Sequence, residues 1–288
     1  MTQEITASAA LRVGIQGYPG AFHEIAARLY FGTAGDLEIM PAHTFDDLAR
    51  MTTDGETDTA LMAIENSLGG SLMYNYNLLQ AGDFSITGEI YLRIKQNLLT
   101  LPGQNIEDLT EVRSHPMAIA QCREFFRNYP QIRLVETTDT ALSAKDIAVN
   151  QRQNVGAIAS TLAARMYKLD IAAAGIETNK LNYTRFLVLQ RGERQNAAEG
   201  INKISVSFAL SHEVGSLQKI LTVMAAYNMN LTKIQSVPIV GKQWEYRFFV
   251  DFMLGEHFDW RQSLEALRPL TADLKLLGAY RKGEHFEQ

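Results

Sequence analysis

The stretch at residues 182–191, NYTRFLVLQR, decides how the larger part of the chain is organised. A threonine and an arginine, Thr184 and Arg185, stand side by side in front of the apolar run FLVL. A short apolar run bounded by polar residues is typical of a buried β-strand. Its first polar residues can cap that strand, or they can face a ligand.

Strand and helix patterns alternate in two blocks before this stretch. The first block starts at LRVGIQG (11–17), passes through TDTALMAIENS (57–67) and ends in a helix pattern at 71–80. A long extended segment, 84–101, leads to a second block of the same kind. Two such blocks predict two α/β lobes. The stretch at 182–191 is then expected to return to the first lobe and complete its sheet.

These patterns predict a first domain at residues 1–190, with hinges between its lobes near 83–95 and 168–175. Residues 191–202, RGERQNAAEGIN, are polar and lack a periodic apolar face, which is typical of a linker. The remaining residues, 203–288, follow the ferredoxin-like βαββαβ order. Two helices on one face of a four-stranded sheet leave an edge strand and a sheet face to be covered. We therefore expect oligomers that form through this second domain, with a dimer as the smallest species.

Composition excludes several classes of protein. The 288 residues are 46% hydrophobic and 20% charged, which is enough apolar material for two folded domains. The net charge is −5 and the basic residues are scattered, which argues against a nucleic-acid partner. No apolar run approaches the ~18 residues of a membrane helix, and the start lacks the pattern of a signal peptide, so we expect a cytoplasmic protein. A single cysteine and no zinc-type spacing imply no structural metal.

Polar residues collect where the predicted strands of the first domain end. In open α/β sheets ligands bind outside these ends, because helix N-termini there attract anions. Each junction can also be a simple helix cap. The segment from Glu65 to Ser71 exceeds the needs of capping, because Asn66 and Ser67 are followed by two glycines. His115 can be a spacer before a helix or a ligand contact.

Two further patterns carry no functional signal. The glycines at 14, 17 and 20 do not match the dinucleotide-binding fingerprint, and no acidic residue ends the second strand, so no nicotinamide cofactor is expected. Cys122 lies in the middle of a predicted helix, where we expect a buried and unreactive thiol.

Six motifs, spread over about residues 12–281, occur in one order. They are GYPGAF (17–22), IENSLGGS (64–71), SHPMAIAQC (114–122), NYTRFLVL (182–189), NLTKIQSVP (230–238) and WEYRFFVDF (244–252). In this the chain resembles the prephenate dehydratases with a C-terminal ACT regulatory domain. The resemblance implies a two-lobed catalytic domain of the periplasmic-binding-protein type (type II), without cofactor or metal. It also implies decarboxylation and dehydration of prephenate to phenylpyruvate in L-phenylalanine biosynthesis, with L-phenylalanine as effector and a homodimer or homotetramer as assembly.

The resemblance also assigns residues. The catalytic set is Thr184, Glu65, Asn66 and Ser67, with Thr184 and Glu65 as alternative sources of the hydrogen bond or proton for the leaving hydroxyl. The expected substrate contacts are Gly20, Ala21, Phe22, Ser114, His115, Thr140, Asn182, Arg185 and Phe186. Arg185 is expected either to hold charge or to maintain the geometry of the lobes. The chain departs from the family pattern at Ala21, Asp139 and Thr178.

The regulatory site implied by the resemblance lies in the second domain. Its expected residues are Gly215, Ser216, Leu217, Asn230, Leu231, Gln235 and Ser236. The chain has Gln235 and Val237 where phenylalanine-binding relatives have Glu and Arg. Phenylalanine can therefore still bind and inhibit, or the domain can serve assembly alone. Prephenate and arogenate remain alternative substrates, and an amino-acid sensor without catalysis remains an alternative function.

Overall fold

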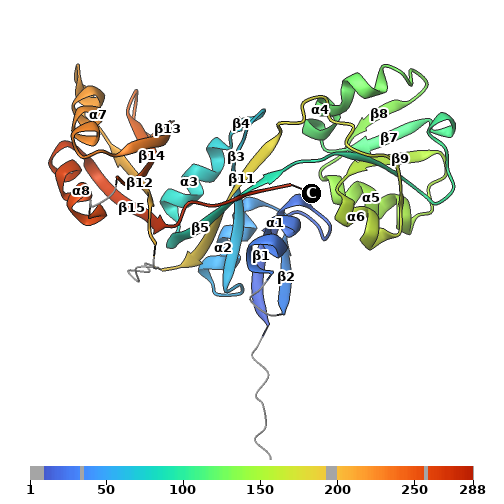
Figure 1. The fold of residues 1–288 in the computed structure, drawn as a ribbon, viewed down its shortest axis with the longest axis horizontal. Helices are drawn as coiled ribbons and strands as arrows, with labels where there is room; N and C mark the ends of the chain where they lie inside the picture. Colours follow the sequence, from blue (N-terminus) through green and yellow to red (C-terminus); the bar gives the residue numbers. More distant parts are fainter. Residues whose placement is uncertain (1–9, 33–35, 193–199, 256–258, 288) are drawn as a thin grey trace, which may run out of the picture.

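The computed structural model describes residues 10–32, 36–192, 200–255 and 259–287. It contains three sheets, which belong to two lobes and a second domain (Figure 1). Figure 1 shows the second domain on one side of the first lobe and the second lobe on the other. Among the described helices, none has the length and apolar character needed to cross a bilayer.

The first lobe is a mixed sheet covered by three helices. Its elements are β1 (Leu11–Gln16), α1 (Phe22–Phe31), β2 (Leu37–Ala42), α2 (Phe45–Thr53), β3 (Thr59–Asn66), β4 (Gly70–Ser71), α3 (Met73–Ala81), β5 (Phe84–Arg93) and β11 (Tyr183–Arg191). The sheet order is β16-β5-β11-β3-β1-β2, with β4 on β3, where β16 (His285–Phe286) comes from the end of the chain. β11 lies between β5 and β3 and is antiparallel to both, which confirms the predicted return of this stretch to the first lobe.

The second lobe repeats the α/β pattern within one continuous segment. Its elements are β6 (Asn97–Thr100), η1 (Ile106–Asp108), β7 (Glu111–Ser114), α4 (Pro116–Phe126), β8 (Arg133–Glu136), α5 (Thr140–Val149), β9 (Val155–Ala159), α6 (Thr161–Tyr167) and β10 (Asp170–Ala173). The chain crosses between the lobes at 94–96 and again at 174–182. The predicted hinge at 168–175 is therefore placed too early, because β10 pairs with β6 inside the second sheet.

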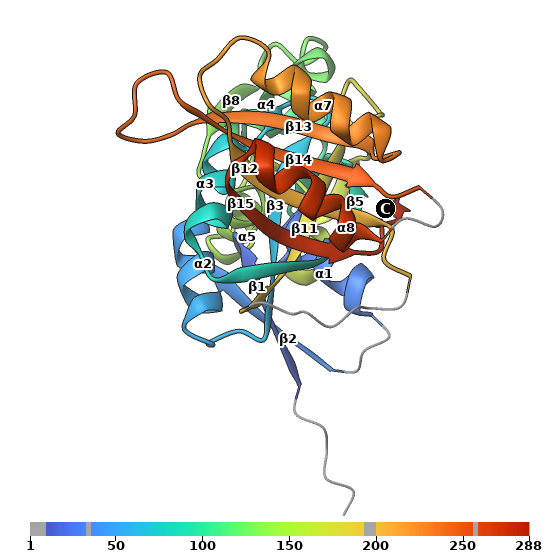
Figure 2. The same cartoon turned by 90° about the vertical axis from the view of Figure 1, so that its left-hand side faces the viewer.

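The second domain has the predicted βαββαβ order. It comprises β12 (Lys203–Ala209), α7 (Ser216–Ala226), β13 (Asn230–Pro238), β14 (Tyr246–Met253), α8 (Trp260–Leu267), η2 (Arg268–Leu270) and β15 (Ala272–Tyr280), in the sheet order β13-β14-β12-β15. Both helices lie on the outer face of this sheet (Figure 2). Of the predicted linker, residues 193–199 lie outside the described part of the chain.

The inner face of the second domain's sheet packs against the first lobe. Val237, Phe249 and Leu277 belong to the same buried cluster as Leu79 and Leu187 of the first lobe. This corrects the expectation that the sheet face needs a partner subunit to cover it, because the chain's own first lobe packs there. The edge strand β13 remains as the argument for assembly through this domain.

The last strand was not predicted. β16 (His285–Phe286) leaves the second domain and pairs in parallel with β5 of the first lobe. Figure 1 shows this segment running from the second domain across the first lobe. The ring of His285 stacks on Tyr91, with 4.5 Å between the ring centroids. At Gly283 a side chain would meet the carbonyl oxygen of Glu89 at 2.0 Å, so the close approach requires glycine.

Candidate active site

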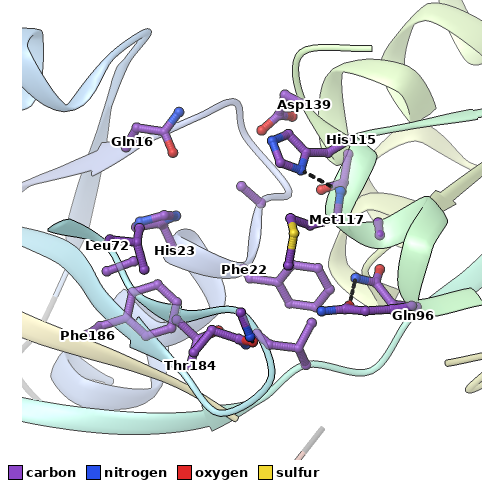
Figure 3. Close-up of a pocket in the computed structure, with 18 of the residues that line it drawn as sticks. Gln16, Phe22, His23, Leu72, Gln96, His115, Met117, Asp139, Thr184 and Phe186 are labelled. Carbon is purple, nitrogen blue, oxygen red and sulfur yellow. Dashed lines mark hydrogen bonds between the residues drawn. The ribbon is translucent and has the colours of Figure 1, made fainter. Parts of the chain in front are cut away.

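The candidate active site is a cavity of about 420 Å³ between the two lobes. Figure 3 shows Thr184, Phe186 and His23 of the first lobe facing His115, Met117 and Asp139 of the second. The cavity is lined by Gln16, Ala21, Phe22, His23, Phe45, Ala63, Asn66, Gly69, Gly70, Ser71, Leu72, Ile94, Gln96, His115, Met117, Ala118, Gln121, Thr138, Asp139, Thr140, Thr184 and Phe186. This set contains no lysine or arginine, so an anionic ligand must be held there by amides, hydroxyls, histidine and helix N-termini.

Thr184 lies at the floor of the cavity, in the second position of β11. It is 9% exposed, and its Oγ1 accepts a hydrogen bond from Nδ2 of Asn66 at 2.9 Å. Because a hydroxyl has one proton and two lone pairs, this bond uses an acceptor position and leaves the proton for a ligand. The geometry thus makes Thr184 a hydrogen-bond donor toward the cavity.

Asn66 organises the residues around Thr184. Its Nδ2 also donates to Oδ1 of Asn182 at 2.8 Å, and its Oδ1 accepts from the backbone N–H groups of Leu68 and Gly69 at 3.0 and 2.8 Å. The amide therefore fixes the turn after β3 and the hydroxyl of Thr184 at the same time. Both oxygen and nitrogen of Asn66 are occupied by protein partners, so we infer a positioning role for it.

His23 was not predicted as a site residue. It lies in the first turn of α1, and its ring packs edge-on against Phe186 with centroids 4.8 Å apart. Burial lowers the pKa of His23 to about 3, so the ring is neutral, and among the described residues its buried Nε2 has no hydrogen-bond partner. Its position directly after the GYPGAF motif was the available sequence signal.

The second lobe contributes the starts of two helices. His115 caps α4, with its Nδ1 accepting from the N–H of Met117 at 3.2 Å, and Asp139 caps α5 through the N–H of Leu142 at 2.7 Å. Burial raises the pKa of Asp139, against backbone hydrogen bonds that favour its charged form. Thr140 follows as the first residue of α5. The predicted residues His115 and Thr140 thus line the cavity, and Asp139 joins them.

A buried glutamine lies at the crossover between the lobes. Gln96 is 3% exposed and donates to Gln121 at 3.4 Å, while its Oε1 has no partner among the described residues. Gln96 was not predicted, because it lies in the long extended segment without a motif of its own. Together with His23 it offers polar atoms that a ligand can satisfy.

Two residues that were predicted to contact the substrate have other partners in the structure. The N–H of Gly20 donates to Glu24 at 2.7 Å, and its carbonyl accepts from Ser160 of the second lobe at 2.6 Å. Ser114 is fully buried and donates to the carbonyl of Ile158 at 2.7 Å. None of these groups lines the cavity, which corrects the expectation that Gly20 and Ser114 contact the substrate. Gly20 instead joins the two lobes.

Ser67 and Asn182 also lie outside the cavity lining. The hydroxyl of Ser67 accepts from the N–H of Tyr183 at 2.9 Å and donates to the carbonyl of Leu181 at 3.0 Å, so it holds the start of β11 to the turn after β3. Asn182 is fully buried and supports Asn66. Both predictions of direct contact are corrected to supporting roles.

Arg185 and Glu65 point away from the cavity, toward the second domain. Arg185 is 4% exposed and donates to Glu89 at 2.7 Å and to Asp251 of the second domain at 2.5 Å. Glu65 forms an ion pair of 2.5 Å with Lys233, also of the second domain. The alternation of side chains along a strand places both residues on the face opposite to Thr184 and Asn66. The expected substrate contact of Arg185 and the acid role of Glu65 therefore have no support in this geometry, whereas a role of Arg185 in holding the structure together does.

The second domain has a cavity of its own, of about 370 Å³, which Ser216 and Leu217 line together with Trp244 and Tyr246. Gly215 precedes α7 with φ of +85°, a conformation that favours glycine. The other predicted regulatory residues, Asn230, Leu231, Gln235 and Ser236, lie on β13 and do not line this cavity.

Comparison with known proteins gives consistent results. The family model for prephenate dehydratase matches residues 13–194. The chain is 36% identical over 290 residues to arogenate dehydratase/prephenate dehydratase 2, chloroplastic, from Arabidopsis thaliana, with 97% of this chain and 75% of the relative covered.

Two solved structures are similar over most of the chain. A prephenate dehydratase from Arthrobacter aurescens in complex with L-Phe has a TM-score of 0.83 and 27% identity, with 94% of this chain and 90% of that chain covered. GqqA, described as a novel type of quorum quenching acylase, has a TM-score of 0.84 and 27% identity, with 94% and 98% covered. The family model, the relative and the fold agree with the motifs of the sequence: the chain belongs to the prephenate dehydratase family.

Proposed function

We propose that the protein is a carbon–oxygen lyase that converts prephenate to phenylpyruvate, with release of carbon dioxide and water. The observation that carries the proposal is the hydroxyl of Thr184 in the cavity lining, which accepts a hydrogen bond from Asn66 and so keeps its own proton available for a ligand. This hydroxyl donates a hydrogen bond to the leaving hydroxyl of the substrate. A positioned donor aimed at developing negative charge contributes about 3 kcal/mol to transition-state stabilisation.

The chemistry asks little more of the protein. The bond from the ring to the carboxylate breaks, its electron pair forms the aromatic ring, and the hydroxyl leaves as hydroxide, which takes up one proton (H⁺) from the buffered solvent and becomes water. Aromatisation drives the reaction, so the enzyme has to orient the substrate and support the leaving group. Neutral His23 lies beside Phe186 at the same wall of the cavity, and its buried Nε2 has no hydrogen-bond partner among the described residues.

The described residues that line the cavity include no lysine or arginine, which fits this reaction. A carboxylate that leaves as neutral carbon dioxide is lost more readily where its charge is weakly stabilised. The carboxylate that remains on the side chain is held by the start of α5 at Thr140 and by His115.

The test is turnover by the full chain. Purified protein is incubated with prephenate and, separately, with arogenate, and the product is followed as the ultraviolet absorbance of phenylpyruvate in alkali or as phenylalanine. Turnover that depends on Thr184 supports the proposal. Turnover of neither substrate contradicts it, and hydrolysis of an acylated amine in a parallel assay would favour the activity described for GqqA.

Regulation and assembly complete the proposal. The ferredoxin-like second domain acts as an ACT domain that binds phenylalanine near Ser216 and Leu217, and the chain forms a homodimer or homotetramer in the cytoplasm. Support comes from the cavity at the start of α7 and from the L-Phe complex of the Arthrobacter aurescens relative. Calorimetry with phenylalanine, beside an activity titration and sedimentation, tests both parts. No heat and no inhibition up to millimolar ligand would leave the domain with assembly alone.

A further inference from the structure

The two strands that carry the candidate catalytic residues have two functional faces. β11 and β3 pair so that Thr184 lies opposite Asn66 and Arg185 lies opposite Glu65. The first pair faces the cavity and the second pair faces the second domain. Any group that binds the second pair therefore acts on the backbone that carries the first pair, one residue away.

Lys233 of the second domain binds Glu65, one residue of the second pair. It lies on β13, its side chain is 14% exposed, and its Nζ donates to Glu65 Oε1 at 2.5 Å and to Ser71 Oγ at 2.7 Å. Ser71 lines the cavity and lies on β4, which pairs with the end of β3 through Glu65–Ser71 and Asn66–Gly70. The ammonium thus joins both sides of the turn that Asn66 organises.

We propose that Lys233 is a positioning residue for the dehydration, supplied by the second domain. By holding Glu65 and Ser71 it fixes the turn between β3 and β4, and so fixes the amide of Asn66 that orients Thr184. The inference rests on the proposed function for its activity readout. It assigns a part of the active-site support to a residue outside the two lobes that form the cavity.

A second lysine provides a matched control. Lys275 of β15 also reaches from the second domain to the first lobe, where its Nζ donates to the carbonyls of Gln80 and Gly82 at 3.2 and 3.1 Å. These carbonyls lie at the end of α3, and neither residue lines the cavity. Lys233→Met and Lys275→Met each remove one lysine contact between the domains, but only the first touches the turn of Asn66.

The first experiment compares kcat and KM of both variants in the full chain. We expect Lys233→Met to lower kcat on the order of 10-fold with a smaller change in KM, because misplacement of a catalytic group by a fraction of an ångström is costly. Lys275→Met should stay within about 2-fold, and Lys233→Arg should recover most of the loss because it retains a donor cation. Equal kcat values for the two methionine variants, or no recovery with arginine, would overturn the proposal.

The second experiment does not depend on turnover. Hydrogen exchange of the amides of Leu68 and Gly69, which Asn66 holds, should become faster in Lys233→Met and remain unchanged in Lys275→Met. Unchanged exchange in both variants refutes the inference even if the enzyme is active. Conversely, failure of the wild type to convert either substrate refutes the proposed function, and the exchange data still decide the role of Lys233.

Discussion

The two lobes contribute different kinds of groups to the same cavity. The first lobe supplies Thr184 and Asn66 from adjacent strands in the middle of a sheet. The second lobe supplies His115, Asp139 and Thr140 from the starts of helices. Strand side chains are fixed by neighbours on both sides, whereas helix starts offer backbone N–H groups and positive dipole ends.

The lobes also differ in their support. On the face opposite the cavity, the first lobe shares a buried apolar cluster with the second domain. Buried ion pairs also join the two, among Arg185, Glu89, Lys203 and Asp251. The second lobe lies on the far side of the first lobe from this domain (Figure 1). We infer that contacts with the second domain support the lobe that orients the donor, whereas the second lobe supplies the groups that meet the charged parts of the substrate. The predictions below separate these two roles.

The largest effect is expected at the donor itself. Thr184→Ala should lower kcat by about 100-fold or more, because it removes the hydrogen bond to the leaving group. Thr184→Ser, which keeps the hydroxyl, serves as control and should retain much more activity. If the alanine variant is folded and as active as the wild type, Thr184 is only a structural residue of β11.

A smaller loss is expected one step further from the substrate. Asn66→Ala should lower kcat by roughly 30-fold, since it removes the partner that orients the hydroxyl and opens the turn at Leu68 and Gly69. Combining it with Thr184→Ala should cost little beyond Thr184→Ala alone, because both changes act through one hydroxyl. Additive losses in the kinetic double-mutant cycle would show that Asn66 acts independently.

The second lobe should affect substrate choice more than turnover. Asp139→Asn keeps a good helix cap but removes a negative charge from the cavity. We expect kcat/KM for prephenate to rise about 5-fold relative to that for arogenate, whose ammonium group a carboxylate favours, with kcat little changed. An unchanged ratio for the two substrates would assign Asp139 to capping alone.

The smallest effect concerns stability and pH. The pKa of His23 is about 3 in the folded chain, below the value of an exposed histidine, so the unfolded chain binds a proton first as the pH falls. The stability associated with neutral His23 is complete above pH 6.5 and is lost as the pH falls toward 3. Between pH 7 and 5, the wild type should therefore lose more free energy of unfolding than His23→Gln, measured by urea titration. Parallel curves for the two proteins would contradict the burial of the ring.

The sequence predicted which strands and helices form the site better than it predicted which of their residues face the cavity. The order of strands and helices and the return of β11 follow from local patterns, and the family resemblance added the cavity residues His115, Thr140 and Phe186. The patterns could not tell whether Gly20 offers its N–H to a ligand, because Glu24 one helical turn later takes it. Nor could they show whether Thr184 or Arg185 faces the cavity, since alternation along a strand places the two on opposite faces but does not tell which face meets the cavity.

Contacts between the domains lay beyond any local pattern. Lys233 and Glu65 are 168 residues apart in the chain, and their ion pair depends on how the sheet of the second domain packs on the first lobe. β16 has two residues, too few for a period to be recognised. Such features follow from tertiary packing, so the residues that support the site were harder to predict than those that line it.

The position of β11 also has a consequence for how the protein folds while it is being synthesised on the ribosome. The second lobe is one continuous segment and can fold as soon as it has emerged, but the first lobe needs β11 between β5 and β3, and β11 is made about ninety residues after β5. Until then β3 and β5 are exposed strands without their central neighbour, a situation that favours aggregation and slow folding. The lobe made first thus gains its central strand only after the second lobe has been made, and that central strand is the one that carries Thr184.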